Sequence, residues 1–382
     1  MPCQMRRIPL QGSDARTHIS AGNDGYRSSP ETQNAIRMKK TTQFFTRRTA
    51  LYVLLGGAAI PLVSSALIPG PAPTRLDGSF LQIWKDDLKL SQTQWAEKVA
   101  TLRALQCHDV VLQWTSFGDE YRMSDESVLA FMDLAYAAGL RVTVGLPYDH
   151  RYWKVLMGQE QIGLAPFMSE MAEAGARFIS NTPYSSHPAF AGWYVPYEID
   201  QYSWRKAEDR THLKNYLLRL RDTLGTKGAP LSISTFFSQL EGAGYLTDVW
   251  SDVLDAGAIR LMVQDGVGVY GMVNYERLAP LFALLKQRNA TFDLVLEVFT
   301  QLPGATAEDL RLVPAQFERV QAQLEAAARV APARILAFAV YPYMAGADPK
   351  AQALGAAYDR AVLGPSHAMS FAGRALDKLR DI

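Results

Sequence analysis

The chain has 382 residues, of which 48% are hydrophobic and 20% are charged, and its formal net charge is +1. This composition is typical of a globular enzyme, and a balanced charge without a clustered basic stripe argues against nucleic acid or an anionic membrane surface as a partner. Cys107 is the one cysteine outside the N-terminal region. We expect no disulfide, and no motif indicates a metal or a cofactor.

The chain divides into a long N-terminal region, one domain and a short tail. Residues 1–37 are polar and aperiodic and precede a second possible start at Met38, so they are either a disordered extension or the product of a misassigned start codon. Residues 67–78 are expected to form a linker, residues 79–365 the domain and residues 366–382 a C-terminal tail.

Residues 38–66 have the features of a bacterial export signal. Arg47 and Arg48 precede an apolar run of about 14 residues, and Ser64 and Ala66 are small residues at the spacing that a signal peptidase recognises. The paired arginines resemble a twin-arginine signal, which predicts passage through the twin-arginine translocase and a periplasmic or secreted location. The apolar run is short for a membrane span, although an uncleaved inner-membrane anchor is the alternative.

Eight short apolar segments alternate with amphipathic segments of helical period in the rest of the chain. Most of them are almost continuously hydrophobic, as is expected of parallel strands covered on both sides, and the uninterrupted series predicts an α/β fold, a single (β/α)8 TIM barrel. No glycine-rich phosphate loop follows the first segment, which argues against an open dinucleotide-binding sheet. The predicted strands are Phe80–Trp84, Asp109–Trp114, Arg141–Pro147, Phe190–Glu198, Pro230–Phe237, Ile259–Asp265, Phe292–Phe299 and Ile335–Tyr341.

Carboxylates, amides and large aromatic residues dominate the carboxyl ends of these strands, where TIM barrels carry their active sites. Sugars are bound by this mixture, because rings cover their apolar faces and polar side chains bind their hydroxyls. The residues predicted to bind a carbohydrate are Gln82, Trp84, Gln113, Trp114, Asp149, Trp153, Tyr194, Tyr197, Gln264, Asp265 and Tyr341.

Two glutamates are the predicted catalytic residues. Glu297 interrupts an apolar strand, where a carboxylate is costly unless it is paired or neutral, so it is either functional or part of a buried ion pair with an arginine. Glu198 ends the fourth strand, on one face with Gly192, and is either a residue of the barrel mouth or a solvated glutamate of the next loop. Asp265 is a third candidate, as a ligand of sugar hydroxyls, a catalytic group or a turn residue.

Several of these segments are similar to one known family, catalogued as domain of unknown function 4434. The resemblance implies an exported barrel of the glycoside-hydrolase type. Strands four and seven also carry the two acids of a large clan of retaining glycosidases, although that clan has asparagine where this chain has Tyr197. The motifs that carry the resemblance are Phe80-x-Gln82-x-Trp84, Gln113-Trp114, Gly145-Leu146 with Trp153 nearby, Gly192-Trp193-Tyr194 through Glu198, and Gln264-Asp265-Gly266-x-Gly268.

The sequence therefore predicts a retaining glycoside hydrolase that acts on a poly- or oligosaccharide outside the cytoplasm. In this hypothesis Glu198 is the acid and base, with a raised pKa, and Glu297 is the nucleophile. The alternatives are a non-catalytic carbohydrate-binding barrel in polysaccharide export or assembly, and a barrel enzyme of another reaction class.

Overall fold

The computed structural model of the chain describes residues 74–225, 229–240, 242, 244–254, 259–304 and 311–364. The proposed signal at residues 38–66, the extension before it and the tail at residues 366–382 lie outside the described residues, so these assignments stay predictions. No helix among the described residues is long and apolar enough to span a membrane.

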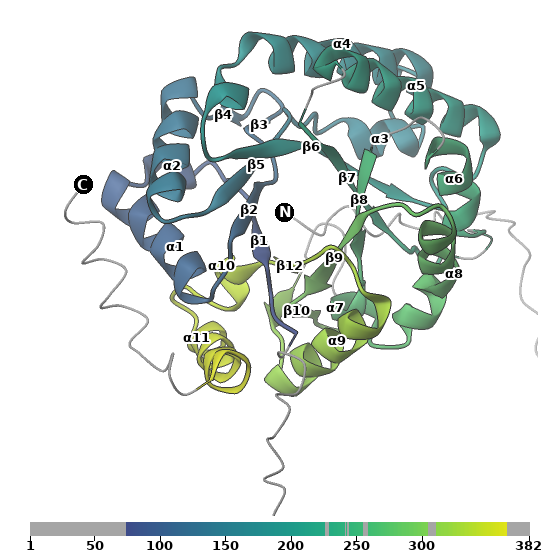
Figure 1. The fold of residues 1–382 in the computed structure, drawn as a ribbon. Coiled ribbons are helices and arrows are strands. Elements are labelled where there is room, and N and C mark those ends of the chain that lie inside the picture. The colour runs from purple at the N-terminus through teal and green to yellow at the C-terminus, as the bar shows by residue number, and fades with distance from the viewer. Residues whose placement is uncertain are drawn as a thin grey trace, which may run out of the picture. The chain divides into compact units, whose positions relative to one another are not determined.

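Eight parallel strands close into a barrel in the order β1-β12-β9-β8-β7-β6-β5-β2 (Figure 1). This confirms the predicted (β/α)8 barrel, with all eight strands inside or overlapping the predicted segments. The barrel strands are β1 (Gly78–Leu81), β2 (Asp109–Leu112), β5 (Arg141–Gly145), β6 (Phe190–Asp200), β7 (Leu231–Phe236), β8 (Ile259–Gln264), β9 (Phe292–Glu297) and β12 (Arg334–Phe338).

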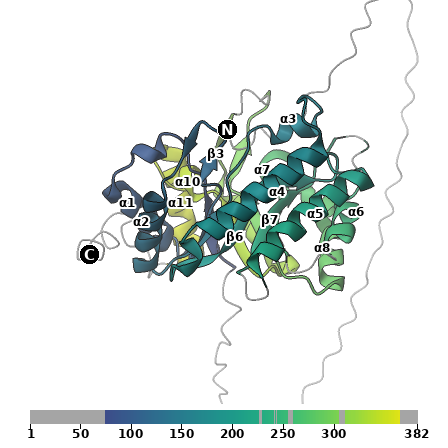
Figure 2. The ribbon, with the colours of Figure 1, turned by 90° about the horizontal axis from the view of Figure 1, so that it is seen from above.

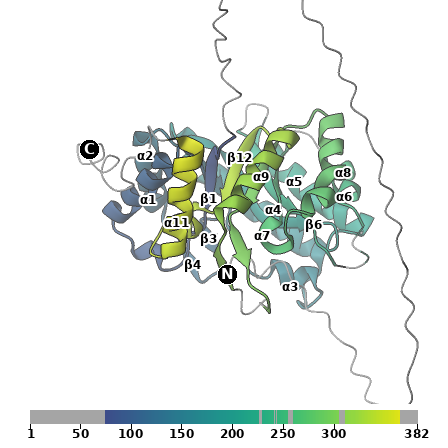
Figure 3. The same cartoon turned by 90° about the horizontal axis from the view of Figure 1, so that it is seen from below.

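A ring of helices surrounds the barrel, and the side views show them packed along the outside of the strands (Figures 2 and 3). This outer layer explains the continuously apolar strands, which are buried against side chains on both faces. The main helices are α1 (Gln92–Ala104), α2 (Asp125–Ala137), α4 (Leu164–Asn181), α5 (Ala207–Leu224), α6 (Leu246–Val253), α8 (Asn274–Gln287), α9 (Phe317–Val330) and α11 (Pro349–Tyr358).

Short additional elements follow the carboxyl ends of several barrel strands, at the end of the barrel where active sites form. They comprise the β3–β4 pair after β2, α3 after β5, α7 after β8, the β10–β11 pair after β9 and α10 after β12. Their bounds are β3 (Ser116–Phe117), β4 (Tyr121–Arg122), α3 (Tyr152–Leu156), α7 (Val267–Tyr270), β10 (Phe299–Gln301), β11 (Leu312–Pro314) and α10 (Val340–Tyr343); η2 (Asp87–Lys89), η3 (Tyr184–Ser186) and η5 (Asp359–Leu363) complete the described elements.

Serine side chains cap the N-termini of two of the outer helices. Ser91 forms a capping box with Gln94, and the hydroxyl of Ser124 accepts a hydrogen bond from the first turn of α2. Asn274 has a different role at the start of α8. It is the first residue of α8, preceded by Val273, and its side-chain amide donates to the carbonyl of Asp265 at 2.7 Å.

Aromatic side chains fill the middle of the barrel. The ring of Phe80 lies 5.3 Å from that of Tyr194 and 5.7 Å from that of Phe338, so residues of the first, fourth and eighth barrel strands meet across the interior. Cys107 is buried, and burial raises the pKa of its thiol to about 12, in agreement with its predicted packing role.

The amino end of the barrel is held by buried ion pairs. Arg334 lies between two acids, with its Nη1 2.9 Å from Asp109 and its Nη2 2.6 Å from Asp293. Arg141 binds Asp109 at 2.7 Å, and Arg260 binds Asp293 at 2.6 Å. Both buried carboxylates are thus paired with cations from neighbouring strands, as stability requires.

Candidate active site at the carboxyl end of the barrel

Glu198 lies in an irregular part of the fourth barrel strand. Between the pairs Val195–Ile233 and Ile199–Thr235, three residues of β6 stand opposite one residue of β7. Such bulges bend a strand and change the direction of its side chains, and they are common beside active sites. Glu198 is one of the three residues in this bulge.

The bulge directs Glu198 and Tyr197 to opposite sides of the strand. The Oε1 of Glu198 accepts a hydrogen bond from Nε2 of Gln264, two strands away, at 2.5 Å. Tyr197 lies outside the strands, where its ring is 4.7 Å from that of Tyr152 and its hydroxyl accepts from the backbone of Asp149. The ring of Tyr197 thus packs between strand and helices, and its role in substrate binding stays a prediction.

Glu297 is the last residue of the seventh barrel strand and faces the barrel interior. It is in register with Phe338 of the neighbouring strand, whose ring contacts Phe80 inside the barrel. Side chains in register in neighbouring strands share a face. Glu198 and Glu297 are thus both buried, on interior faces of barrel strands four and seven.

Asp265 is buried on the opposite side of its strand from Gln264. Its Oδ1 accepts from the backbone N–H groups of Val267 and Glu297, each at 3.1 Å. Its Oδ2 accepts from Nε2 of Gln323 at 2.6 Å and from the hydroxyl of Tyr275 at 3.4 Å. Both oxygens accept from protein donors between sheet and helices, so the interactions that the structure shows for Asp265 are with the protein itself.

Two glycines of the Gln264–Gly268 motif allow close packing within the protein. A Cβ on Gly268 would lie 2.5 Å from the carbonyl oxygen of Phe299, and Gly266 has a φ of +65° at the start of α7. The segment after β9 thus packs closely against the backbone at Gly268. A Cβ on Gly192 would likewise lie 2.7 Å from the carbonyl oxygen of Pro230.

Three of the predicted carbohydrate-binding residues have buried polar atoms without a hydrogen-bond partner among the described residues. These atoms are Nε2 of Gln82, Oε1 of Gln113 and Nε1 of Trp153. The ring of Trp153 lies 6.4 Å from that of Phe236, a residue of the fifth barrel strand that we had not selected as a ligand contact. Buried polar atoms normally have partners, so these groups are available for a ligand.

Trp84 is half-buried, with its ring edge-on to that of Trp114 at 5.6 Å, and it stays a candidate ring for a sugar face. Trp114 itself is buried, and its indole N–H donates to the carbonyl of Ile83 at 2.9 Å. Tyr194 is also buried, with its hydroxyl 2.8 Å from that of Ser234. Both side chains are thus buried in the packed core, and their roles in substrate binding stay predictions.

Asp149 and Tyr341 are engaged by basic side chains. Arg151 binds Asp149 at 2.7 Å; burial acts to raise the pKa of Asp149, but its bonds to Arg151 outweigh burial and lower it. Tyr341 lies under the ammonium group of Lys98 from α1, 4.6 Å from the ring centroid, on the outer side of the strands. The roles of Asp149 and Tyr341 in substrate binding stay predictions.

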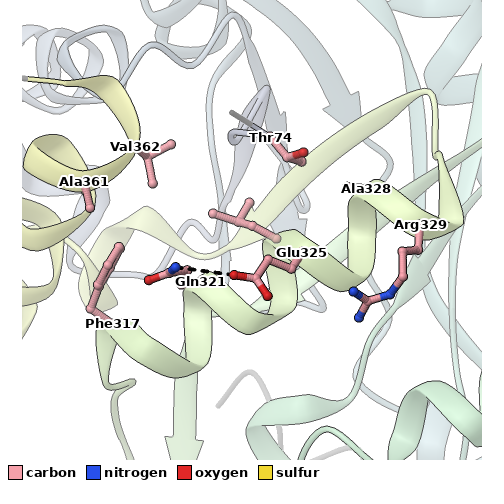
Figure 4. A pocket seen from close by; sticks show the side chains of 9 residues that line it. Thr74, Phe317, Gln321, Glu325, Ala328, Arg329, Ala361 and Val362 are labelled. Carbon is pink, nitrogen blue, oxygen red and sulfur yellow. Dashed lines mark hydrogen bonds between the residues drawn. The ribbon is translucent and has the colours of Figure 1, made fainter. Parts of the chain in front are cut away.

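A separate cavity of about 440 Å³ lies on the outside of the barrel, between α9 and η5 (Figure 4). Phe317, Leu324 and Val362 line it together with polar residues of α9. Neither of the two predicted catalytic glutamates, Glu198 and Glu297, is among its lining residues. Among the described residues, no group of three or more His, Cys, Asp or Glu side chains could hold a metal ion.

Gln323 and Arg319 of α9 were missed by the sequence analysis. Arg319 donates to the carbonyls of Glu297 and Phe299 at 3.1 and 2.7 Å. A signal for Gln323 was present, since this amide falls on the apolar face of its helix, between Val320 and Leu324. A polar residue at a core position of an amphipathic helix indicates a buried partner.

The model of one protein family, Domain of unknown function (DUF4434), matches residues 76–353. The chain belongs to this family. It is 30% identical to the uncharacterised protein YbcH of Escherichia coli K12 over 221 residues, which cover 55% of this chain and 72% of that protein.

Solved structures share the barrel at low sequence identity. A candidate alpha-L-fucosidase from Bacteroides thetaiotaomicron has a TM-score of 0.60 at 17% identity, covering 80% of this chain and 98% of that one. An endo-beta-1,4-mannanase from Thermotoga petrophila has a TM-score of 0.48 at 10% identity, covering 70% of this chain and 68% of that one. At these identities the likeness shows the fold, and function has to be argued from the site.

Proposed function

We propose that the chain is a retaining glycoside hydrolase of an extracytoplasmic poly- or oligosaccharide, with Glu198 as acid and base and Glu297 as nucleophile. The observation that supports this most is the presence of two buried carboxylates on the interior faces of barrel strands four and seven, at the carboxyl end. The hydrogen bond from Gln264 to Oε1 of Glu198 holds one of them within the barrel mouth.

The reaction would proceed in two displacements. Glu297 attacks the anomeric carbon while Glu198 gives its proton to the departing glycosidic oxygen, which leaves a glycosyl ester on Glu297 and an ionised Glu198. Glu198 then removes a proton from water as the water attacks the same carbon and releases Glu297. The sugar keeps its anomeric configuration, and both carboxyls return to their starting states.

Amide and indole groups of the barrel mouth would orient the sugar. The buried Nε2 of Gln82 and Nε1 of Trp153 can donate to hydroxyls, and Oε1 of Gln113 can accept from one. Gln264 would orient the acid, and the half-buried ring of Trp84 would cover a sugar face. Loss of these groups should raise KM more than it lowers kcat.

The test is a screen of the purified domain against bacterial exopolysaccharides and plant glucans, with product anomers followed by proton NMR. Glu297→Gln should abolish turnover and keep glycan binding, and retained configuration should appear in the first product formed. Inverted product would remove the double displacement. Glycan binding without cleavage by the wild-type chain would favour the carbohydrate-binding barrel instead.

The proposal of an extracytoplasmic substrate rests on the signal at residues 38–66. Replacing both Arg47 and Arg48 by lysine should leave the precursor in the cytoplasm of a host with a twin-arginine translocase. N-terminal sequencing of the exported wild type should place the mature start after Ala66. A full-length protein retained in the inner membrane would favour an uncleaved anchor.

A further inference from the structure

Asp265 continues the hydrogen-bond ladder beyond the end of β8. Gln264 is the last residue of that strand and pairs with Val295, and the N–H of Asp265 donates to the carbonyl of Val295 at 2.9 Å. The next inward-facing residue of β9 is Glu297, whose N–H donates to the side-chain Oδ1 of Asp265 at 3.1 Å. The side-chain carboxylate of Asp265 thus accepts the hydrogen bond from the N–H of Glu297, the proposed nucleophile, where a backbone carbonyl would accept it in a regular ladder.

The carbonyl of Glu297 is held by side chains as well. It accepts from Nε2 of Gln323 at 3.2 Å and from Nη2 of Arg319 at 3.1 Å, both on α9. The same Nε2 of Gln323 donates to Oδ2 of Asp265 at 2.6 Å, which links the two acids through one amide. Since the backbone determines the direction of the Cα–Cβ bond, these contacts determine the direction in which the Glu297 side chain leaves the strand.

The cluster brings two carboxylates close to a cation. Arg319 of α9 interacts with the charges of both Asp265 and Glu297, and α8 contributes the hydroxyl of Tyr275. Burial, and secondly the charge of Glu297, raises the pKa of Asp265 to about 6. Burial lowers the pKa of Arg319, and the two acids oppose this effect.

We propose that Asp265 is the positioning residue of Glu297. With Gln323 and Arg319, it fixes the backbone of Glu297 and places a second carboxyl behind it, so that the direction in which the Glu297 side chain leaves the strand depends on Asp265 and the charges of the two acids are linked. The proposal rests on the proposed function only in giving Glu297 a reaction to perform.

A test that needs no substrate is the titration of Asp265 by NMR, with carbon-13 at the aspartate side-chain carboxyls and the signal assigned through Asp265→Asn. Glu297→Gln keeps the size of the side chain but removes its charge, and should lower the pKa of Asp265 from about 6. Arg319→Met removes the neighbouring cation and should raise the pKa of Asp265. Opposite shifts cannot come from general loosening of the fold.

Asp109→Asn is the matched control, because it removes a buried carboxylate at the other end of the barrel. It should leave the titration of Asp265 unchanged. A shift in Glu297→Gln no larger than the control shift would overturn the proposal, as would shifts of equal sign in Glu297→Gln and Arg319→Met. If Glu297→Gln does not fold, Arg319→Met against the same control decides.

A glycan cleaved in the screen gives a second measurement. Asp265→Asn should lower kcat about tenfold or more with little change in KM, because Glu297 loses the contact that positions it while the sugar contacts remain. Absence of any turnover would contradict the proposed function, while the NMR titration would still decide the role of Asp265.

Discussion

The two ends of this barrel handle buried acids in different ways. At the amino end, Asp109 and Asp293 are bound by arginines of neighbouring strands, and Arg334 bridges both. At the carboxyl end, Glu198 and Asp265 are held by amides and backbone N–H groups. Acids neutralised by cations stabilise the fold but cannot readily exchange protons, whereas acids held by neutral donors remain open to titration and chemistry.

Glu198 allows the most direct test of this difference between the two ends of the barrel. Glu198→Gln should lower the rate on any cleaved glycan about 10²–10⁴-fold, because it removes the proton donor. The unfolding free energy should stay the same or rise, since a buried carboxylate is replaced by a neutral amide of equal size. Rate and thermal unfolding should be measured on the same preparation. A loss of stability with an unchanged rate would place Glu198 with the structural acids.

Arg334→Met should have the opposite effects. It leaves two buried acids short of a shared cation, and breaking a buried ion pair costs about 3–5 kcal/mol. Denaturant unfolding should show this loss, while the folded fraction keeps the wild-type KM. A small effect on stability would mean that Arg141 and Arg260 are sufficient for Asp109 and Asp293.

The pH dependence of stability gives a further test of the difference between the two ends, through Asp265. Its pKa in the folded chain, about 6, lies above the ordinary value of 3.8. The neutral acid is therefore favoured by folding, and the stability from this group is complete below pH 3.8 and is lost as the pH rises through about 6. Asp265→Asn should remove this part of the pH dependence of thermal unfolding. An unchanged dependence would contradict the raised pKa.

The sequence predicted the barrel well because eight apolar segments in series allow few other folds. It predicted the site less well, because residues at the carboxyl ends of the strands were selected without distinguishing side chains that face the barrel interior from those that face the helices. Gln113 and Gln264 have polar atoms directed to the interior, whereas their neighbours Trp114 and Asp265 pack outside the strands. The side-chain period of two could have separated these pairs.

Other features of the site could not be obtained from one strand at a time. The bulge at Glu198 is a mismatch between β6 and β7, so it depends on two segments that are distant in sequence. The contacts of Gln323 and Arg319 with Glu297 likewise depend on how α9 packs against β9. Both features depend on tertiary structure, whereas the local sequence pattern indicates only that a buried polar side chain has some partner.

Gln113 gives the finest test of the difference between the two ends, because its Oε1 is buried without a partner among the described residues. Gln113→Met has a similar volume and removes the polar group, so it should leave stability unchanged or raise it by about 1 kcal/mol. The same variant should weaken glycan binding, measured by calorimetry on the Glu297→Gln background. Asp109→Asn, the corresponding polar loss at the amino end, should instead destabilise, because two arginines lose charge partners. If Gln113→Met were also destabilising, its amide would be a structural group, and the carboxyl end would have to be regarded as core in the same sense as the amino end.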